Sequence, residues 1–189
     1  RVNQERGNYI YTNIERELIN PIQSMEINGI KVDKEYLSNL SIKFSQRIEK
    51  LEKKIYKETG SEFNIGSPKQ LSEILFDKLK LKPPKKTKTG EKSTGIEVLE
   101  DLAYEGNKVA DNIIQWRQLS KLKNTYTDAL QNHIVRETGR IHTSFAMAST
   151  NTGRLASSDP NLQNIPIRTE EGKSIRKAFI PDQGFVMLA

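Results

Sequence analysis

The sequence predicts an α+β fold, in which an elongated arm of antiparallel helices is joined to an incomplete antiparallel sheet. Apolar residues recur at spacings of three and four through most of residues 33–133, as the buried face of an α-helix requires. After Gly139 they alternate with polar residues, which is typical of a strand with one buried face. Hydrophobic residues make up only 35% of the chain and charged residues 29%. This balance favours an arm with a high ratio of surface to core.

Two helices are predicted in the first part of the arm. The first begins after Asp33, a suitable N-cap, and ends at Gly60. The second begins at Ser67, where Ser-Pro-Lys-Gln provides an N-cap hydroxyl, a proline in the first turn and a glutamine at the capping-box position. The apolar faces consist of Leu37, Leu40, Phe44, Ile48, Leu51 and Ile55 in the first helix and Leu71, Ile74, Leu75 and Leu79 in the second.

Two more helices and a basic loop complete the predicted arm. Thr94 and Glu97 repeat the capping-box spacing and predict a short helix that ends near Gly106. Residues 78–92 carry seven lysines and one glutamate, so we expect a flexible basic loop near 80–95 that can follow a phosphate backbone. The last helix is predicted over 108–133, with its buried side formed by Val109, Ile113, Trp116, Leu119, Leu122, Tyr126 and Leu130.

The sheet is predicted from the last third of the chain. Ile141, Thr143, Phe145 and Met147 alternate with polar or small residues and indicate one strand. Residues 178–180, a turn at 181–184 and residues 185–188 predict a hairpin that extends the sheet. We expect the exposed edge of an incomplete sheet to allow weak self-association. Because an apolar strand rarely ends a protein, we also expect the chain to continue beyond residue 189.

The composition favours a polyanionic partner. Thirty Lys and Arg residues against 24 Asp and Glu give a net charge of +6, and cysteine is absent. No stretch approaches the roughly 20 apolar residues of a membrane span, so no membrane contact is expected. His133 and His142 are too few and too far apart in the sequence to predict a metal site. We expect a cytoplasmic protein, associated with the bacterial nucleoid, with an organellar location left open.

The segment from Thr150 to Arg168, TNTGRLASSDPNLQNIPIR, is rich in amides and hydroxyls, as in loops that carry binding groups. The longer run TGRLASSDPNLQNIPIRTEEGKSIRKAFIP resembles the stretch of family A DNA polymerases, the bacterial polymerase I type, that precedes the first catalytic carboxylate motif. Upstream, NGIKVD, FNIGSPKQLSEILF and KLKNTYTDAL resemble the same family in order and spacing. The resemblance therefore covers nearly the whole chain.

The resemblance implies residues 1–32 as an entry segment of the palm, 33–137 as the thumb with its basic tip, and 138–189 as the first part of the palm. It implies DNA synthesis in replication and repair, with primer-template DNA and deoxynucleotide triphosphates as partners and Mg²⁺ as the cofactor of the complete enzyme. No catalytic or metal-binding residue is expected in this chain. Asp159 is isolated, and the adjacent Glu170 and Glu171 would point apart on a strand.

Five candidate residues lie in the polar segment from Thr150 to Arg168. By resemblance, Arg154 reaches the minor groove at the primer terminus, where every correct base pair offers an acceptor; otherwise it is a solvated surface group. Asn161 and Gln163 either cap turns around the prolines or contact DNA. Arg168 either pairs with a neighbouring glutamate or lies beside the incoming triphosphate. The resemblance also implies DNA contact for Thr152.

The other candidates lie on the predicted helices. Lys69 and the free N–H groups after Ser67 form an ordinary capped helix end or bind a phosphate. By resemblance, the sugar-phosphate backbone is contacted by a second group, which consists of Lys123, Asn124, Thr125 and Thr127. Such residues also commonly face solvent without consequence.

The alternative function is a stand-alone basic helical module that binds nucleic acid without catalysis. Coding sequence beyond residue 189 would separate the two, because an aspartate close by supports the polymerase and a stop codon the module.

Overall fold

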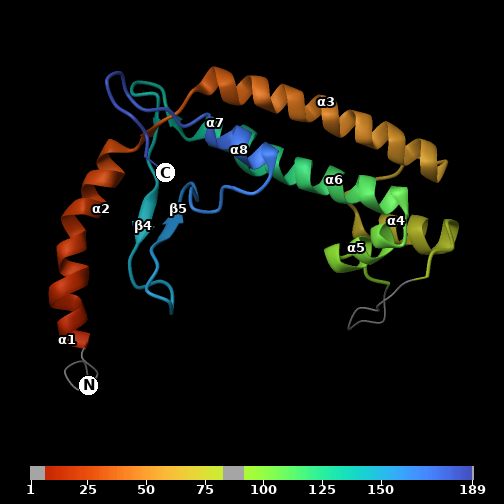
Figure 1. The fold of residues 1–189 in the computed structure, drawn as a ribbon, viewed down its shortest axis with the longest axis horizontal. Coiled ribbons are helices and arrows are strands. Elements are labelled where there is room, and N and C mark those ends of the chain that lie inside the picture. Colours follow the sequence, from red (N-terminus) through yellow and green to blue (C-terminus); the bar gives the residue numbers. More distant parts are fainter. Residues whose placement is uncertain (1–6, 83–91, 189) are drawn as a thin grey trace. The chain divides into compact units, whose positions relative to one another are not determined.

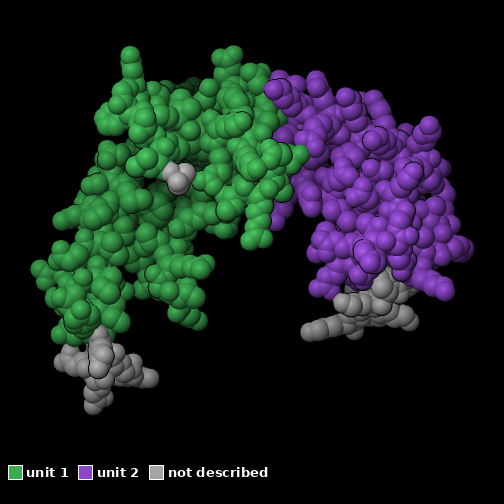
Figure 2. Space-filling view, viewed as in Figure 1, with its two compact units in different colours: residues 1–40, 125–189 green, residues 41–124 purple. Residues whose placement is uncertain are grey.

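The computed structural model describes residues 7–82 and 92–188. The chain divides into two compact units, unit 1 with residues 1–40 and 125–189 and unit 2 with residues 41–124 (Figure 2). The chain is mainly helical, with short strands concentrated after α7 (Figure 1). Three π-helical segments, labelled η, interrupt the helices among the described residues, and one short strand, β1, precedes α3. The predicted α+β class is confirmed. The elements are α1 (Gly7–Ile10), η1 (Tyr11–Glu15), α2 (Arg16–Asn28), β1 (Ile30–Lys31), α3 (Lys34–Thr59), α4 (Pro68–Ser72), η2 (Glu73–Lys78), α5 (Ile96–Tyr104), α6 (Lys108–Leu122), η3 (Lys123–Asp128), α7 (Ala129–Asn132), β2 (Ile134–Val135), β3 (Arg140–Ile141), β4 (Ser144–Ala146), β5 (Ala156–Ser158) and α8 (Glu170–Arg176).

The two predicted helices of the first half form where their capping residues place them. The carboxylate of Asp33 accepts a hydrogen bond from the Tyr36 amide at 2.8 Å, which fixes the start of α3. The hydroxyl of Ser67 accepts from the Gln70 amide at 3.4 Å at the start of α4. The Gln70 side chain accepts from the Asn64 amide at 2.7 Å, so it holds the preceding loop and does not complete a capping box at Ser67.

The third predicted helix forms, but its N-cap differs from the prediction. The N-cap of α5 is Gly95, and no side chain caps it. Thr94 is buried, and its carbonyl accepts a hydrogen bond from the Arg117 guanidinium at 2.6 Å. Thr94 is therefore buried against α6 and does not cap α5, contrary to the prediction from the sequence spacing.

Unit 2 has its own apolar core. The Asn107 side chain caps α6 by accepting from the Ala110 amide at 3.1 Å. Trp116 is half-buried, and its Nε1 donates to the Glu52 carboxylate of α3 at 2.9 Å, so its indole has a structural partner inside the unit. Leu99, Leu75 and Ile113 have no exposed surface. The core cluster comprises Ile55, Ile65, Leu71, Leu75, Phe76, Val98, Leu99, Leu102, Val109, Ala110 and Ile113.

The sheet of unit 1 is smaller and more divided than predicted. The alternating burial of residues 141–147 is present, but the expected single strand is split into β3 and β4. β3 lies between β1 and β2 in one antiparallel sheet, with Ile141 paired to both Ile30 and Ile134. β4 pairs with β5 in a second sheet. The predicted strand is divided because its two parts have different partners: β3 pairs with β1 and β2, whereas β4 pairs with β5.

The predicted hairpin over residues 178–188 is wrong. Phe179 forms an isolated bridge with Val32, and Ile180 donates to the Lys31 carbonyl at 3.1 Å, so this segment joins the outer edge of β1. Residues 185–188 form no described strand, and Phe185 is 73% exposed. Helix α8 was not predicted from the sequence, although Thr169 is a regular N-cap for it and accepts from the Gly172 amide at 3.1 Å. Self-association stays a prediction.

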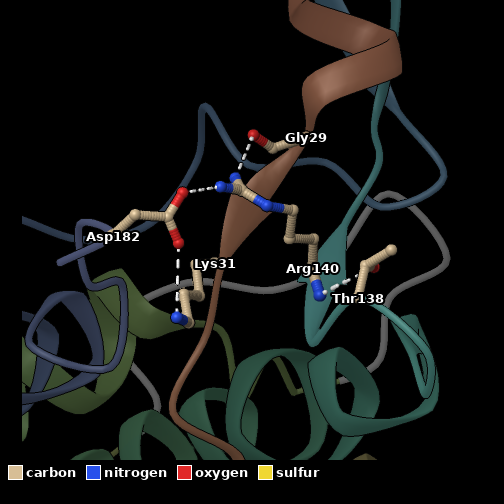
Figure 3. A network of polar contacts seen from close by, with 5 residues as sticks. All are labelled: Gly29, Lys31, Thr138, Arg140 and Asp182. Atoms are coloured by element: carbon tan, nitrogen blue, oxygen red, sulfur yellow. Dashed lines mark hydrogen bonds and ion pairs between the residues drawn. The ribbon is translucent and has the colours of Figure 1, made fainter.

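A polar network fixes this added edge (Figure 3). Asp182 lies between Arg140 of β3 and Lys31 of β1, with its carboxylate hydrogen-bonded to the Arg140 guanidinium and 3.2 Å from the Lys31 ammonium. Arg140 also donates to the Gly29 carbonyl at 3.2 Å. The turn at 181–184 is therefore tied to both strands by charge-assisted contacts.

Candidate nucleic-acid interface

The candidate interface in unit 1 is centred on the loop between β4 and β5. The loop's backbone is closed by Thr150, whose hydroxyl accepts from the Arg154 amide at 3.0 Å and donates to the Arg154 carbonyl at 2.9 Å. Gly153 has a φ of 73°, which gives the turn before Arg154. Thr152 and Arg154 are both exposed. In the described residues no hydrogen bond or ion pair engages the Arg154 guanidinium, so its cationic donors face outward.

A buried pair of hydroxyls ties the start of β4 to β5 and to the segment after β5. Leu162 N donates to Ser157 Oγ at 3.1 Å, Ser157 Oγ lies 2.7 Å from Thr143 Oγ1, and Thr143 Oγ1 donates to the Pro160 carbonyl at 2.8 Å. Thr143 is 7% exposed and Ser157 4%. Buried polar groups that are fully paired specify one conformation. The polar segment after β5 is thus held from inside the unit.

Thr143→Val tests this network. We expect the substitution to lower the free energy of unfolding by about 1 to 3 kcal/mol, because it removes the Thr143 hydroxyl from its buried contacts with Ser157 Oγ and the Pro160 carbonyl. Chemical denaturation measures the change. Thr12→Val is the matched control, since Thr12 is exposed and the exchange there is expected to stay within about 0.5 kcal/mol. Equal effects at both positions would contradict the assigned role.

The turn that follows carries the two predicted amides. Asn161 Oδ1 accepts from the Gln163 amide at 3.0 Å and from the Asn164 amide at 3.2 Å, so its side chain caps the turn. Gln163 is exposed and lines a cavity of about 250 Å³ together with Arg176. The Tyr126 hydroxyl donates to the Asn164 carbonyl, and burial raises the pKa of this phenol. Asn161 and Tyr126 therefore act as supports of the turn, and Gln163 is available on its surface.

Arg168 is exposed immediately before the N-cap of α8. Glu170 pairs with Lys173 at 2.7 Å, an interaction that lowers the pKa of this carboxyl, and not with Arg168. Gly172 lets α8 approach the loop closely, because a Cβ there would lie 2.8 Å from the Pro166 Cβ. Arg168 is thus presented at a fixed helix start.

The candidates in unit 2 lie on two separate elements. Lys69 is exposed in the first turn of α4, where it lines a cavity of about 940 Å³ with Lys92 and Arg117. Burial lowers the pKa of the Arg117 guanidinium, which already donates to the Thr94 carbonyl. Asn124 is exposed and Lys123 half-buried at the start of η3. The other predicted basic residues of the tip, within 83–91, lie outside the described residues.

Thr127 is a correction to the predicted interface. It is fully buried, with 0% of its surface exposed, and its hydroxyl lies 3.4 Å from the Asp128 carboxylate. A side chain in this position does not face a phosphate. Tyr126 and Thr127 are the two buried residues of η3, so Thr127 lies on the inner side of this segment.

The predicted sites depend on supporting residues to which the sequence assigned no role in the interface. Thr143, Ser157 and Tyr126 hold the polar segment, and Glu26 accepts from the Phe145 amide at 2.6 Å. No local pattern signals these contacts, since the partners lie between 14 and 119 positions apart in the sequence. Within residues 7–82 and 92–188 no group of three or more His, Cys, Asp or Glu side chains could hold a metal ion. None of the described helices has the length and apolar character of a membrane span.

Comparisons with known proteins identify the family of the chain. Residues 34–189 match the family described as DNA polymerase family A. The chain therefore belongs to DNA polymerase family A. It is 52% identical over 180 residues to DNA polymerase I of Rhizobium leguminosarum, covering 95% of this chain and 18% of that protein. To the thermostable DNA polymerase I of Thermus thermophilus it is 44% identical over 186 residues, covering 98% of this chain and 22% of the relative.

A solved structure has a closely similar fold. The POL domain of Pol1 from M. smegmatis, in complex with DNA primer-template and dNTP, matches with a TM-score of 0.88 and 36% identity. The match covers 98% of this chain and 32% of the other. The chain spans about a fifth of the length of the curated relatives it matches.

Proposed function

We propose that this chain is the part of a template-directed DNA polymerase that grips primer-template DNA, and that the complete enzyme adds deoxynucleotides in DNA replication and repair at the nucleoid. The observation that carries the proposal is the loop between β4 and β5, in which the Thr150 hydroxyl is bonded to the backbone of Arg154 and the arginine side chain stays exposed. A relative with 36% identity is described in complex with primer-template DNA and dNTP.

The chemistry of the exposed groups suits this role. Arg154 and Thr152 offer donors that can reach minor-groove acceptors, which lie at similar positions in every correct base pair. Lys69, Lys123 and Asn124 in unit 2 offer contacts to phosphates without reading sequence. Arg168 supplies a cation for the triphosphate, where it would stabilise charge on the leaving pyrophosphate.

The described residues bind and orient, and do not transfer nucleotides by themselves. Two-metal catalysis requires carboxylates that hold both ions, and the residues described here form no such group. We therefore assign the Mg²⁺ ions and their ligands to other parts of the complete enzyme, and the thumb and first part of the palm to this chain.

We expect the 189-residue chain to bind primer-template DNA weakly and without sequence preference. Because the contacts are mainly to phosphates, log K should fall with log[salt] at about 0.9 per phosphate neutralised. Fluorescence anisotropy of labelled DNA over a range of salt concentrations measures the slope. An affinity that does not depend on the salt concentration would refute the proposal. The absence of binding at low ionic strength would also refute it, provided that circular dichroism shows the chain to be helical.

A further inference from the structure

Glu26, in the last turn of α2, contacts residues 142–145, which lead from β3 into β4, at two points. Its Oε1 accepts a hydrogen bond from the Phe145 amide at 2.6 Å. Its backbone carbonyl lies 2.8 Å from His142 Nδ1. Because a carbonyl oxygen only accepts, His142 Nδ1 carries the proton in this contact. One residue of α2 thus holds both ends of residues 142–145.

The Phe145 amide bonds to a side chain because the second sheet has only two strands, β4 and β5. β4 pairs only with β5, so the other edge of β4 has backbone groups without a strand partner. The Phe145 amide is one of them, and a carboxylate is a strong acceptor for such an N–H. Within the described residues the Glu26 carboxylate makes no ion pair, so the backbone is its partner.

The position of β4 determines the position of Arg154. Phe145 is opposite Ser157 in the register of β4 and β5. The loop between these strands, residues 147–155, is closed by Thr150, with both the amide and the carbonyl of Arg154 bonded to that hydroxyl. A displacement of β4 relative to α2 therefore moves the arginine with it.

We propose that Glu26 is a positioning residue, whose carboxylate fixes β4 on α2 and thereby places the Arg154 guanidinium for contact with the primer terminus. This inference rests on the proposed function, because it concerns the DNA contact of Arg154. Glu26 itself touches no substrate. Its effect on nucleotide addition passes through the strand and the loop.

The test compares Glu26→Ala and Glu26→Gln in the complete polymerase. Glutamine retains an oxygen acceptor for the Phe145 amide, whereas alanine removes it. We expect E26A to slow single-nucleotide addition about tenfold, the effect of one lost hydrogen bond to a charged acceptor, and E26Q to retain most of the rate. Glu17→Ala is the control on the same helix, because Glu17 is exposed, and no change is expected.

A double-mutant cycle separates positioning from general destabilisation. In an Arg154→Ala background, E26A should slow addition less than about twofold further, because the group that it positions is already gone. A purely structural role would give multiplied effects. Multiplied effects, or a wild-type rate for E26A, would overturn the proposal. If E26A does not fold, Glu26→Met replaces it, since methionine has similar volume without an oxygen acceptor.

Amide hydrogen exchange gives a readout that needs no catalysis. The Phe145 amide should exchange faster in E26A than in the wild type and at nearly the wild-type rate in E26Q. Unchanged exchange in E26A would overturn the proposal, because the contact would then not protect the strand. A wild-type polymerase that extends no primer, with the exchange difference present, would instead refute the proposed function.

Discussion

Arg154→Ala is expected to slow nucleotide addition by about ten- to a hundredfold while the thermal midpoint stays almost unchanged. The removed contact is a charge-assisted hydrogen bond, which contributes on the order of 1.5 to 3 kcal/mol if it is made at the transition state. Stability should hardly change, because the guanidinium is exposed and the loop is closed through the backbone of Arg154, not through its side chain. Single-turnover primer extension and thermal denaturation of the complete enzyme measure the two quantities.

The control for this prediction lies in the DNA. A primer that ends in a 3-deazapurine lacks the minor-groove nitrogen acceptor, so it should slow the wild-type enzyme but add little to the defect of the variant. Fully additive penalties would show that Arg154 does not donate to that atom. The site assigned to it would then be wrong.

Gly29→Ala is expected to destabilise unit 1 by about 3 kcal/mol or more. Gly29 ends α2 with φ 58° and ψ −168°, a backbone region that is essentially reserved for glycine and costs other residues about 1 to 3 kcal/mol. A Cβ at this position would also lie 2.5 Å from the Ile141 carbonyl oxygen and 2.8 Å from His142 Nδ1. The backbone atom cannot move aside without shifting β3. Equilibrium unfolding in urea measures the loss.

Gly139→Ala is the matched control for this substitution. Gly139 has a similar φ of 65°, but a Cβ there meets no atom within 4 Å. Its cost should therefore be limited to the conformational penalty of roughly 1 to 2 kcal/mol. Equal losses at the two glycines would mean that the close approach of α2 to β3 contributes nothing.

The helices could be predicted from the sequence because their signals are local. Asp33, Ser67 and Gly60 lie within a few residues of the helix ends that they define, and the apolar spacing inside the helices repeats without interruption. The cap at Thr94 failed for a non-local reason, since α6 buries that residue through Arg117.

The strands and the interface supports depend on contacts that sequence spacing does not contain. Residues 141–147 alternate as one strand would, yet β3 and β4 belong to different sheets. Phe179 pairs with Val32, far away in the sequence, and not with the nearby residues 185–188. Arg154 was found through a resemblance, whereas Glu26 is visible only when α2 and β4 are brought together. The prediction therefore failed where it depended on pairing between residues far apart in the sequence, and not in the apolar pattern.

The hydrogen bond from Trp116 to Glu52 makes this chain suitable for optical measurements. The sequence has one tryptophan, and both partners of its indole contact belong to unit 2. Intrinsic fluorescence excited at the indole band therefore reports on unit 2 alone, whereas far-ultraviolet circular dichroism sums the helices of both units. Melting curves recorded by the two signals on one sample would coincide if the units unfold together and separate if they do not. A substitution in unit 1, such as that at Gly29, can then be followed for its effect on unit 2 without any added label.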